Sequence, residues 1–166
     1  MEKLVELYRK WAGSAPAKVE KLAGAGSNRA YYRLTDSEGK TVIGVIGTSR
    51  DENHAFIYLA KHFAKRQLPV PHVLAVSVDE MCYLQTDLGV ISLFDAIRGG
   101  RETGGRYNLA EQELLRKTIK ELPNFQLRGA RGLDYSYCYP QAEFNEESVL
   151  FDLNYFKYCF LKATEI

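Results

Sequence analysis

The feature that most constrains the fold is a series of five short strand-like segments with a single helix among them. Residues 17–35 (AKVEKLAGAGSNRAYYRLT) are typical of two strands joined by a glycine-containing turn, and KTVIGVIG at 40–47 predicts a third strand. A helix follows from about Ser49, since Ser49 and Glu52 form an S-x-x-E capping box. VPHVLAVSVD and MCYLQTDLG predict two further strands. This order favours an α+β fold built on a five-stranded antiparallel sheet with one packed helix.

The second half of the chain changes from strand to helix patterns. A short helix is predicted from Ser92 to Gly99-Gly100, a longer one from Asn108 to Pro123, and a last one from about Asn145. The chain is therefore divided into a β-rich part, 1–89, and an incomplete helical part, 90–166.

The last helix is apolar or aromatic on almost every side. One of its faces carries Val149, Leu150, Leu153, Phe156 and Phe160. A helix of this kind is usually buried all round, so self-association through residues 149–161 is predicted.

Composition narrows the classes of partner. The 166 residues carry 22 basic and 21 acidic side chains, a net charge of +1 that argues against nucleic acid or a membrane surface as the main partner. No apolar leader and no apolar run of about 18 residues are visible. Three cysteines without a C-x-x-C pattern indicate reduced thiols and a cytoplasmic protein. The three histidines have no metal-ligand spacing, so no metal site is predicted.

The glycine-containing turn consists of Gly24, Ala25, Gly26, Ser27, Asn28 and Arg29. It lies between two strands rather than before a helix, which excludes a Walker A loop and a Rossmann turn. A glycine-rich hairpin can fold over a triphosphate, because bare backbone N–H groups approach the oxygens closely. The alternative is a hairpin that needs small residues only to turn.

The fifth strand runs into Gln85, Thr86, Asp87 and Leu88. A strand-to-loop step of this kind can offer an adenine one backbone donor and one acceptor. The alternative is that Leu88-Gly89 merely ends the strand. The tyrosine-rich segment 134–140 is interpreted as packing, with contact to a substrate ring as its alternative.

In their order, several segments resemble the aminoglycoside phosphotransferase superfamily, which has a protein-kinase-like fold. The segments are GSNRAYYRL, VIGVIGTSRDENHAFIYLAKHF, LPVPHVLA, YLQTDLGVISLFDAI and ESVLFDLNYFKYCFLK, and the bacterial N-acetylmuramate or N-acetylglucosamine kinases are the most similar branch. The resemblance implies that residues 24–29 cover the phosphates of ATP and that residues 85–88 hold adenine. It also places Glu52 on the helix that pairs with a strand lysine.

The sequence departs from the family pattern in two respects. The third strand contains no interior lysine, which leaves Arg29 or Arg33 as the hypothetical substitute. The catalytic H-G-D-x-x-x-x-N pattern and the metal-binding aspartate motif do not occur, so no catalytic or metal-binding residue is assigned.

The resemblance therefore implies the ATP-binding portion of a small-molecule phosphotransferase, catalytically incomplete as this chain. Its complete form would use ATP and Mg²⁺ and act on a sugar or amino-sugar hydroxyl. The alternatives are a truncated or pseudokinase-type module that binds nucleotide or protein without catalysis, and a choline- or homoserine-type kinase.

Overall fold

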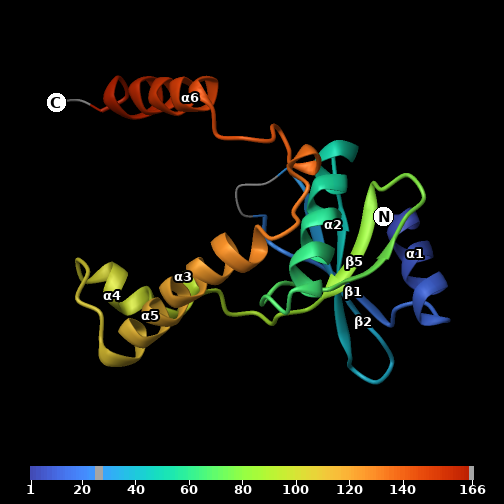
Figure 1. Ribbon diagram of the computed structural model, residues 1–166. Helices are drawn as coiled ribbons and strands as arrows, with labels where there is room; N and C mark the ends of the chain where they lie inside the picture. The colour runs from blue at the N-terminus through green and yellow to red at the C-terminus, as the bar shows by residue number, and fades with distance from the viewer. Residues whose placement is uncertain (25–27, 165–166) are drawn as a thin grey trace. The chain divides into compact units, whose positions relative to one another are not determined.

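The computed structural model of the protein describes residues 1–24 and 28–164 (Figure 1). Its contacts divide the chain into two compact units, Met1–Leu133 and Asp134–Ile166. The boundary predicted at residue 89 falls inside the first unit, where strands give way to helices.

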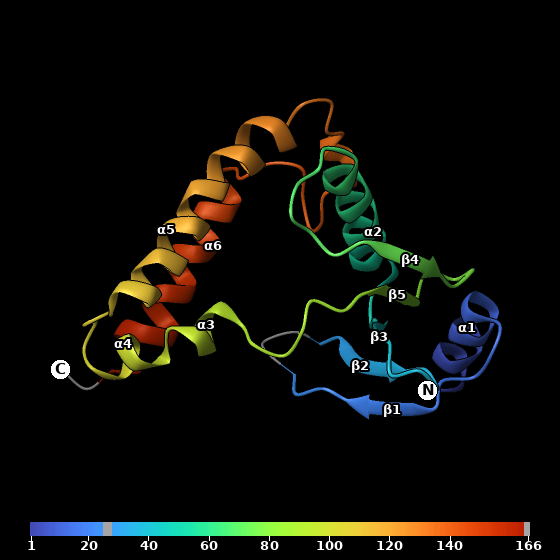
Figure 2. The same ribbon diagram turned by 90° about the horizontal axis from the view of Figure 1, so that it is seen from below.

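The first unit is built on one five-stranded antiparallel sheet with the strand order β1-β2-β3-β5-β4. The strands are β1 (Lys18–Lys21), β2 (Ala30–Thr35), β3 (Thr41–Ile46), β4 (Val73–Val76) and β5 (Cys82–Thr86). Strand β3 lies at the centre, and β1 and β4 form the two edges (Figure 2). The α+β class and the five-stranded antiparallel sheet predicted from the sequence are thereby confirmed.

Helices pack on both faces of this sheet, on opposite sides of it in Figure 1. Helix α1 (Glu2–Ala12) buries Leu4 and Tyr8 against one face, in a cluster that includes Leu84 of β5. Helix α2 (Arg50–Lys65) buries Ile57 against the other face. The sequence predicted one packed helix; the apolar stripe of α1 supplies the second, because it faces the sheet rather than solvent.

Ser49 begins α2 as predicted, since its side chain accepts a hydrogen bond from the backbone N–H of Glu52. The start of α2 is also fixed by Asn53, which is fully buried and donates from Nδ2 to the carbonyl of Glu80 at 2.8 Å. A Cβ at Gly47 would lie 2.1 Å from that Nδ2 atom, so this position requires glycine.

The helices after the sheet differ in one respect from the prediction. They are α3 (Leu93–Ala96), α4 (Arg98–Glu102), α5 (Leu109–Pro123) and a π-helical segment η1 (Asn124–Gly129). Gly99-Gly100 was predicted to end a helix, and this is wrong, because both glycines lie inside α4. Gly100 is needed for close packing instead: its N–H donates to Glu111 Oε1 at 2.9 Å, and a Cβ there would meet the ring of Tyr107 at 2.0 Å.

The segment after α5 returns to α2. The buried ring of His62 contacts the carbonyl of Gly129 through Nε2 at 2.7 Å. The rings of Phe63 and Phe125 meet edge to face, with centroids 5.6 Å apart. These contacts hold residues 124–129 against the end of α2.

The second unit contains a short 3₁₀ turn, η2 (Tyr135–Tyr137), helix α6 (Glu146–Phe156) and a π-helical continuation, η3 (Lys157–Leu161). The Asn145 side chain caps α6 by accepting from the N–H of Ser148. No residue of α6 is buried within the described part of the chain. Among the described residues, no helix has the length and apolar character that a membrane span requires.

Candidate functional site

An ion pair joins the start of β2 to the first turn of α2. Arg29, the residue before β2, places Nη2 2.9 Å from Glu52 Oε1 and donates to the Glu52 backbone carbonyl at 3.1 Å. The Arg29 side chain is only 10% exposed, whereas Glu52 is 35% exposed. The pair therefore holds a nearly buried cation directly after the exposed Asn28.

Aromatic rings line this ion pair along the sheet. The guanidinium carbon of Arg29 lies 5.3 Å from the ring centroid of Phe56, and Phe56 in turn stacks on Tyr83 with centroids 5.0 Å apart. Burial raises the pKa of the Tyr83 phenol well above its ordinary value, and the Arg29 charge opposes that rise. The stacked rings fix the guanidinium in position, which favours a defined geometry for any anion that it contacts.

A second ion pair crosses the same face of the sheet. Arg33 lies opposite Ile43 of β3, and Ile43 lies opposite Gln85 of β5. From this position Arg33 Nε reaches Asp87 Oδ2 at 2.5 Å, and Arg33 Nη2 reaches Asp87 Oδ1 at 3.1 Å and the carbonyl of Gly89 at 3.0 Å. The hydrogen bonds from Arg33 lower the pKa of Asp87 to about 2. The bridge therefore fixes the segment that leaves β5.

The other residues predicted at the end of β5 have different environments. Gln85 presents a buried Oε1 atom with no hydrogen-bond partner in the described part of the chain. The Thr86 hydroxyl accepts from the N–H of His72 at 3.0 Å. Leu88 is 73% exposed. Of Gln85, Thr86 and Leu88, Gln85 is therefore the one with a buried polar atom that has no partner among the described residues.

The predicted phosphate loop is described in part. Gly26 and Ser27 lie outside the described residues. Gly24 is exposed, and a Cβ added to it would meet nothing within 4 Å. Asn28 is exposed too.

Among the predicted residues, the structure brings Arg29 and Glu52 into contact and gives Asp87 a side-chain role. The sequence analysis named Arg33 only as an alternative to Arg29, and it missed Phe56 and Tyr83. The apolar character of those two rings gives no sequence signal that separates a site wall from ordinary core.

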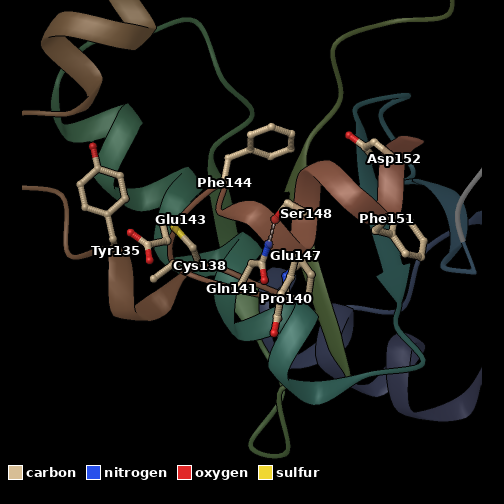
Figure 3. A pocket seen from close by; sticks show the side chains of 11 residues that line it. Tyr135, Cys138, Pro140, Gln141, Glu143, Phe144, Glu147, Ser148, Phe151 and Asp152 are labelled. Atoms are coloured by element: carbon tan, nitrogen blue, oxygen red, sulfur yellow. Dashed lines mark hydrogen bonds between the residues drawn. The ribbon is translucent and has the colours of Figure 1, made fainter. Parts of the chain in front are cut away.

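The second unit contains a cavity of its own, of about 760 Å³ (Figure 3). The loop residues Tyr135, Cys138 and Phe144 and the α6 residues Ser148 and Phe151 contribute to its lining. The Gln141 amide donates to the Ser148 hydroxyl across it (Figure 3). Tyr135, Tyr137 and Tyr139 of the tyrosine-rich segment are 49%, 40% and 52% exposed, so its interpretation as packing stays a prediction.

The described residues contain no group of three or more His, Cys, Asp or Glu side chains that could hold a metal ion. His54 instead contacts Glu80 Oε1 through Nδ1 at 2.9 Å. No protein-family model matches the chain, and no curated protein matches its sequence.

Proposed function

We propose that the sheet and α2 form the ATP-binding part of a small-molecule phosphotransferase with a kinase-like fold, similar to the aminoglycoside phosphotransferases. Three features support the proposal: the order of five antiparallel strands, the single helix between β3 and β4, and the ion pair that joins this helix to the sheet. The complete protein would transfer phosphoryl to a sugar or amino-sugar hydroxyl, as the resemblance of the segments implies.

The Arg29–Glu52 pair is the observation that carries the proposal. In protein kinases a lysine on the third strand pairs with a glutamate of the packed helix and contacts the phosphates of ATP. Here β3 has no lysine, and Arg29, the residue before β2, makes the corresponding pair with Glu52 at 2.9 Å. An arginine suits this task because its planar fork can bind a carboxylate and a phosphate oxygen at once.

The end of β5, on the face of the sheet that α2 covers, supplies groups that could contact the adenine base of ATP. The buried Gln85 Oε1 lacks a partner in the described part of the chain, and it can accept a hydrogen bond from an exocyclic amino group. The Arg33–Asp87 bridge holds the backbone after β5 in one conformation. A base donor and acceptor would come from that backbone near Leu88, whose N–H and C=O make no hydrogen bond with other described residues.

Nucleotide binding, rather than transfer, is what these residues would perform. Mg²⁺ bound with the nucleotide would supply charge neutralisation to its phosphates, and no described residue of this chain is assigned to hold it. The absence of a lysine from β3 also favours a second candidate, a module that binds nucleotide without transferring phosphoryl. Both candidate functions predict that the chain binds nucleotide, and only the phosphotransferase predicts that the complete protein transfers phosphoryl.

Calorimetric titration of the 166-residue chain with MgATP tests the proposal, with adenosine as a second ligand. We expect MgATP to bind more tightly than adenosine, because Arg29 acts on the phosphates. Arg29→Gln should weaken MgATP by about 10- to 100-fold, the value of one or two charge-assisted hydrogen bonds, and leave adenosine unchanged.

Arg9→Gln, at an arginine of helix α1 on the opposite face of the sheet from α2, is the matched control and should bind like the parent chain. Thermal unfolding of each variant separates lost binding from lost folding. Absence of MgATP binding to the folded parent chain, or equal affinity of the parent and Arg29→Gln chains, contradicts the proposal.

A further inference from the structure

The apolar surface of α6 and η3 has no partner within the described part of the chain. Its exposed large side chains, each at least 40% exposed, are Val149, Leu150, Phe151, Leu153, Tyr155, Phe156, Tyr158, Phe160 and Leu161. Soluble chains rarely leave so continuous an apolar surface in water, so it marks a contact surface.

Four of these side chains form a stripe with the spacing of a two-stranded coiled coil. Val149, Leu153, Phe156 and Phe160 follow one another at intervals of four, three and four residues, as d, a, d and a positions do. The rings of Phe156 and Phe160 stack with centroids 5.2 Å apart, so the π-helical continuation keeps both on one side. We call these four residues the seam.

The opposite side of α6 is used within the second unit itself. Ser148 and Phe151 line the cavity that this helix forms with the loop before it (Figure 3). Phe151 also stacks on Tyr155, with centroids 6.4 Å apart. None of the seam residues lines that cavity. The seam is therefore the side left for a separate partner.

We propose that the partner is a second copy of this chain, and that the two copies of α6 and η3 pair through the seam in a parallel, in-register arrangement. The charges beside the seam carry this choice. Asp152 and Lys157 lie on its two flanks, five residues apart, at g and the following e positions. In a parallel in-register pair, a g residue meets the e residue five positions later on the other helix.

Asp152 of each copy then faces Lys157 of the other, which gives two ion pairs related by the two-fold axis. Neither residue makes an ion pair with other described residues. Lys157 Nζ lies 5.4 Å from the ring centroid of Tyr158, a contact that leaves its charge without an acidic partner. In an antiparallel pair each flank meets the same flank of the other copy, and Asp152 and Lys157 lie apart.

Disulfide trapping in the full chain tests both the partner and the orientation. In a Cys138→Ser/Cys159→Ser background, Val149→Cys places one thiol in the seam, where a parallel in-register pair sets it opposite its own copy. We expect mild oxidation to give a disulfide-linked dimer. Phe151→Cys, on the opposite side of α6, is the matched control and should stay monomeric.

Two trapping results overturn the proposal. The first is that Val149→Cys and Phe151→Cys form equal amounts of disulfide-linked dimer, or that Val149→Cys forms no such dimer. The second is linkage of Val149→Cys only when it is mixed with Phe160→Cys, which is the result of an antiparallel pair.

Charge exchange gives an independent test by sedimentation equilibrium. Asp152→Lys puts like charges beside the seam and should raise the dimer dissociation constant at least about tenfold. The double variant Asp152→Lys/Lys157→Asp should restore it. A monomeric parent chain at high micromolar concentration, or equal dissociation constants for the single and double variants, overturns the proposal. Because these side chains are exposed, thermal unfolding of the first unit should not change.

Discussion

Replacement of Asp87 by asparagine should remove a pH-dependent contribution to stability. The Asp87 carboxylate is 7% exposed and receives two hydrogen bonds from Arg33, at 2.5 and 3.1 Å, and one from the N–H of Gly89 at 2.9 Å. These donors stabilise the charged form, so the pKa of Asp87 falls from 3.8 to about 2 in the folded protein.

The size of the effect follows from that shift. The pKa of Asp87 is lowered by somewhat under two units, and each unit corresponds to about 1.4 kcal/mol. Asp87 therefore contributes about 2 kcal/mol to the free energy of unfolding. Because the folded pKa lies below the unfolded one, the contribution is fully present above about pH 4. It is lost as the pH falls through about 2, where folded Asp87 takes up its proton.

Urea unfolding of the parent chain and Asp87→Asn between pH 2 and 7 measures this contribution. We expect the parent chain to be about 2 kcal/mol more stable near pH 6, with the difference shrinking steadily below pH 4. Glu102→Gln, at an exposed carboxylate without an ion pair in the described part of the chain, is the control and should show no such dependence. A difference between parent and Asp87→Asn that stays constant across this range refutes the reasoning.

Two further substitutions test the packing that holds α2. Gly47→Ala should destabilise the protein by about 2–3 kcal/mol, measured by urea unfolding, because its Cβ would lie 2.1 Å from Nδ2 of the fully buried Asn53. His62→Phe should cost about 1–2 kcal/mol in the same assay, because it leaves the Gly129 carbonyl, now 2.7 Å from Nε2, without a partner.

Each of these substitutions has a control at an open site. Gly24→Ala adds a methyl group with no neighbour within 4 Å, and His72→Phe alters an exposed side chain. Both should leave stability within about 0.5 kcal/mol of the parent chain. A loss as large as that of Gly47→Ala or His62→Phe would show that the assigned contacts are not the cause.

The five strands along the chain and the start of α2 could be predicted because their signals are local, whereas the order of the strands within the sheet was not predicted. Alternating apolar residues between turns mark the five strands, and Ser49 marks the helix start three residues before the N–H that it caps. Gly99-Gly100 misled the prediction, since a glycine pair can equally permit close packing. The contact of Gly100 with Tyr107 depends on a chain reversal that no local pattern encodes.

The candidate site depended on strand register, which the sequence does not reveal. Arg29 and Arg33 were equivalent substitutes for the missing lysine by composition and spacing. The register of β2 against β3 and β5 separates them: Arg33 is directed across Ile43 towards Asp87, and Arg29 is left beside Glu52. The sequence analysis predicted that the backbone at Asp87 contacts adenine. The same register shows that the side chain of Asp87 pairs with Arg33.

Amide hydrogen exchange of the 166-residue chain, with and without saturating MgATP, tests the central claim most directly. If the sheet and α2 hold the nucleotide, peptides covering residues 22–33 and 84–90 should exchange more slowly in its presence, because these segments would contact the phosphates and the base. Peptides from α1, on the other face of the sheet, should not change. Equal exchange of all peptides with and without MgATP, or protection confined to the second unit, would contradict the account.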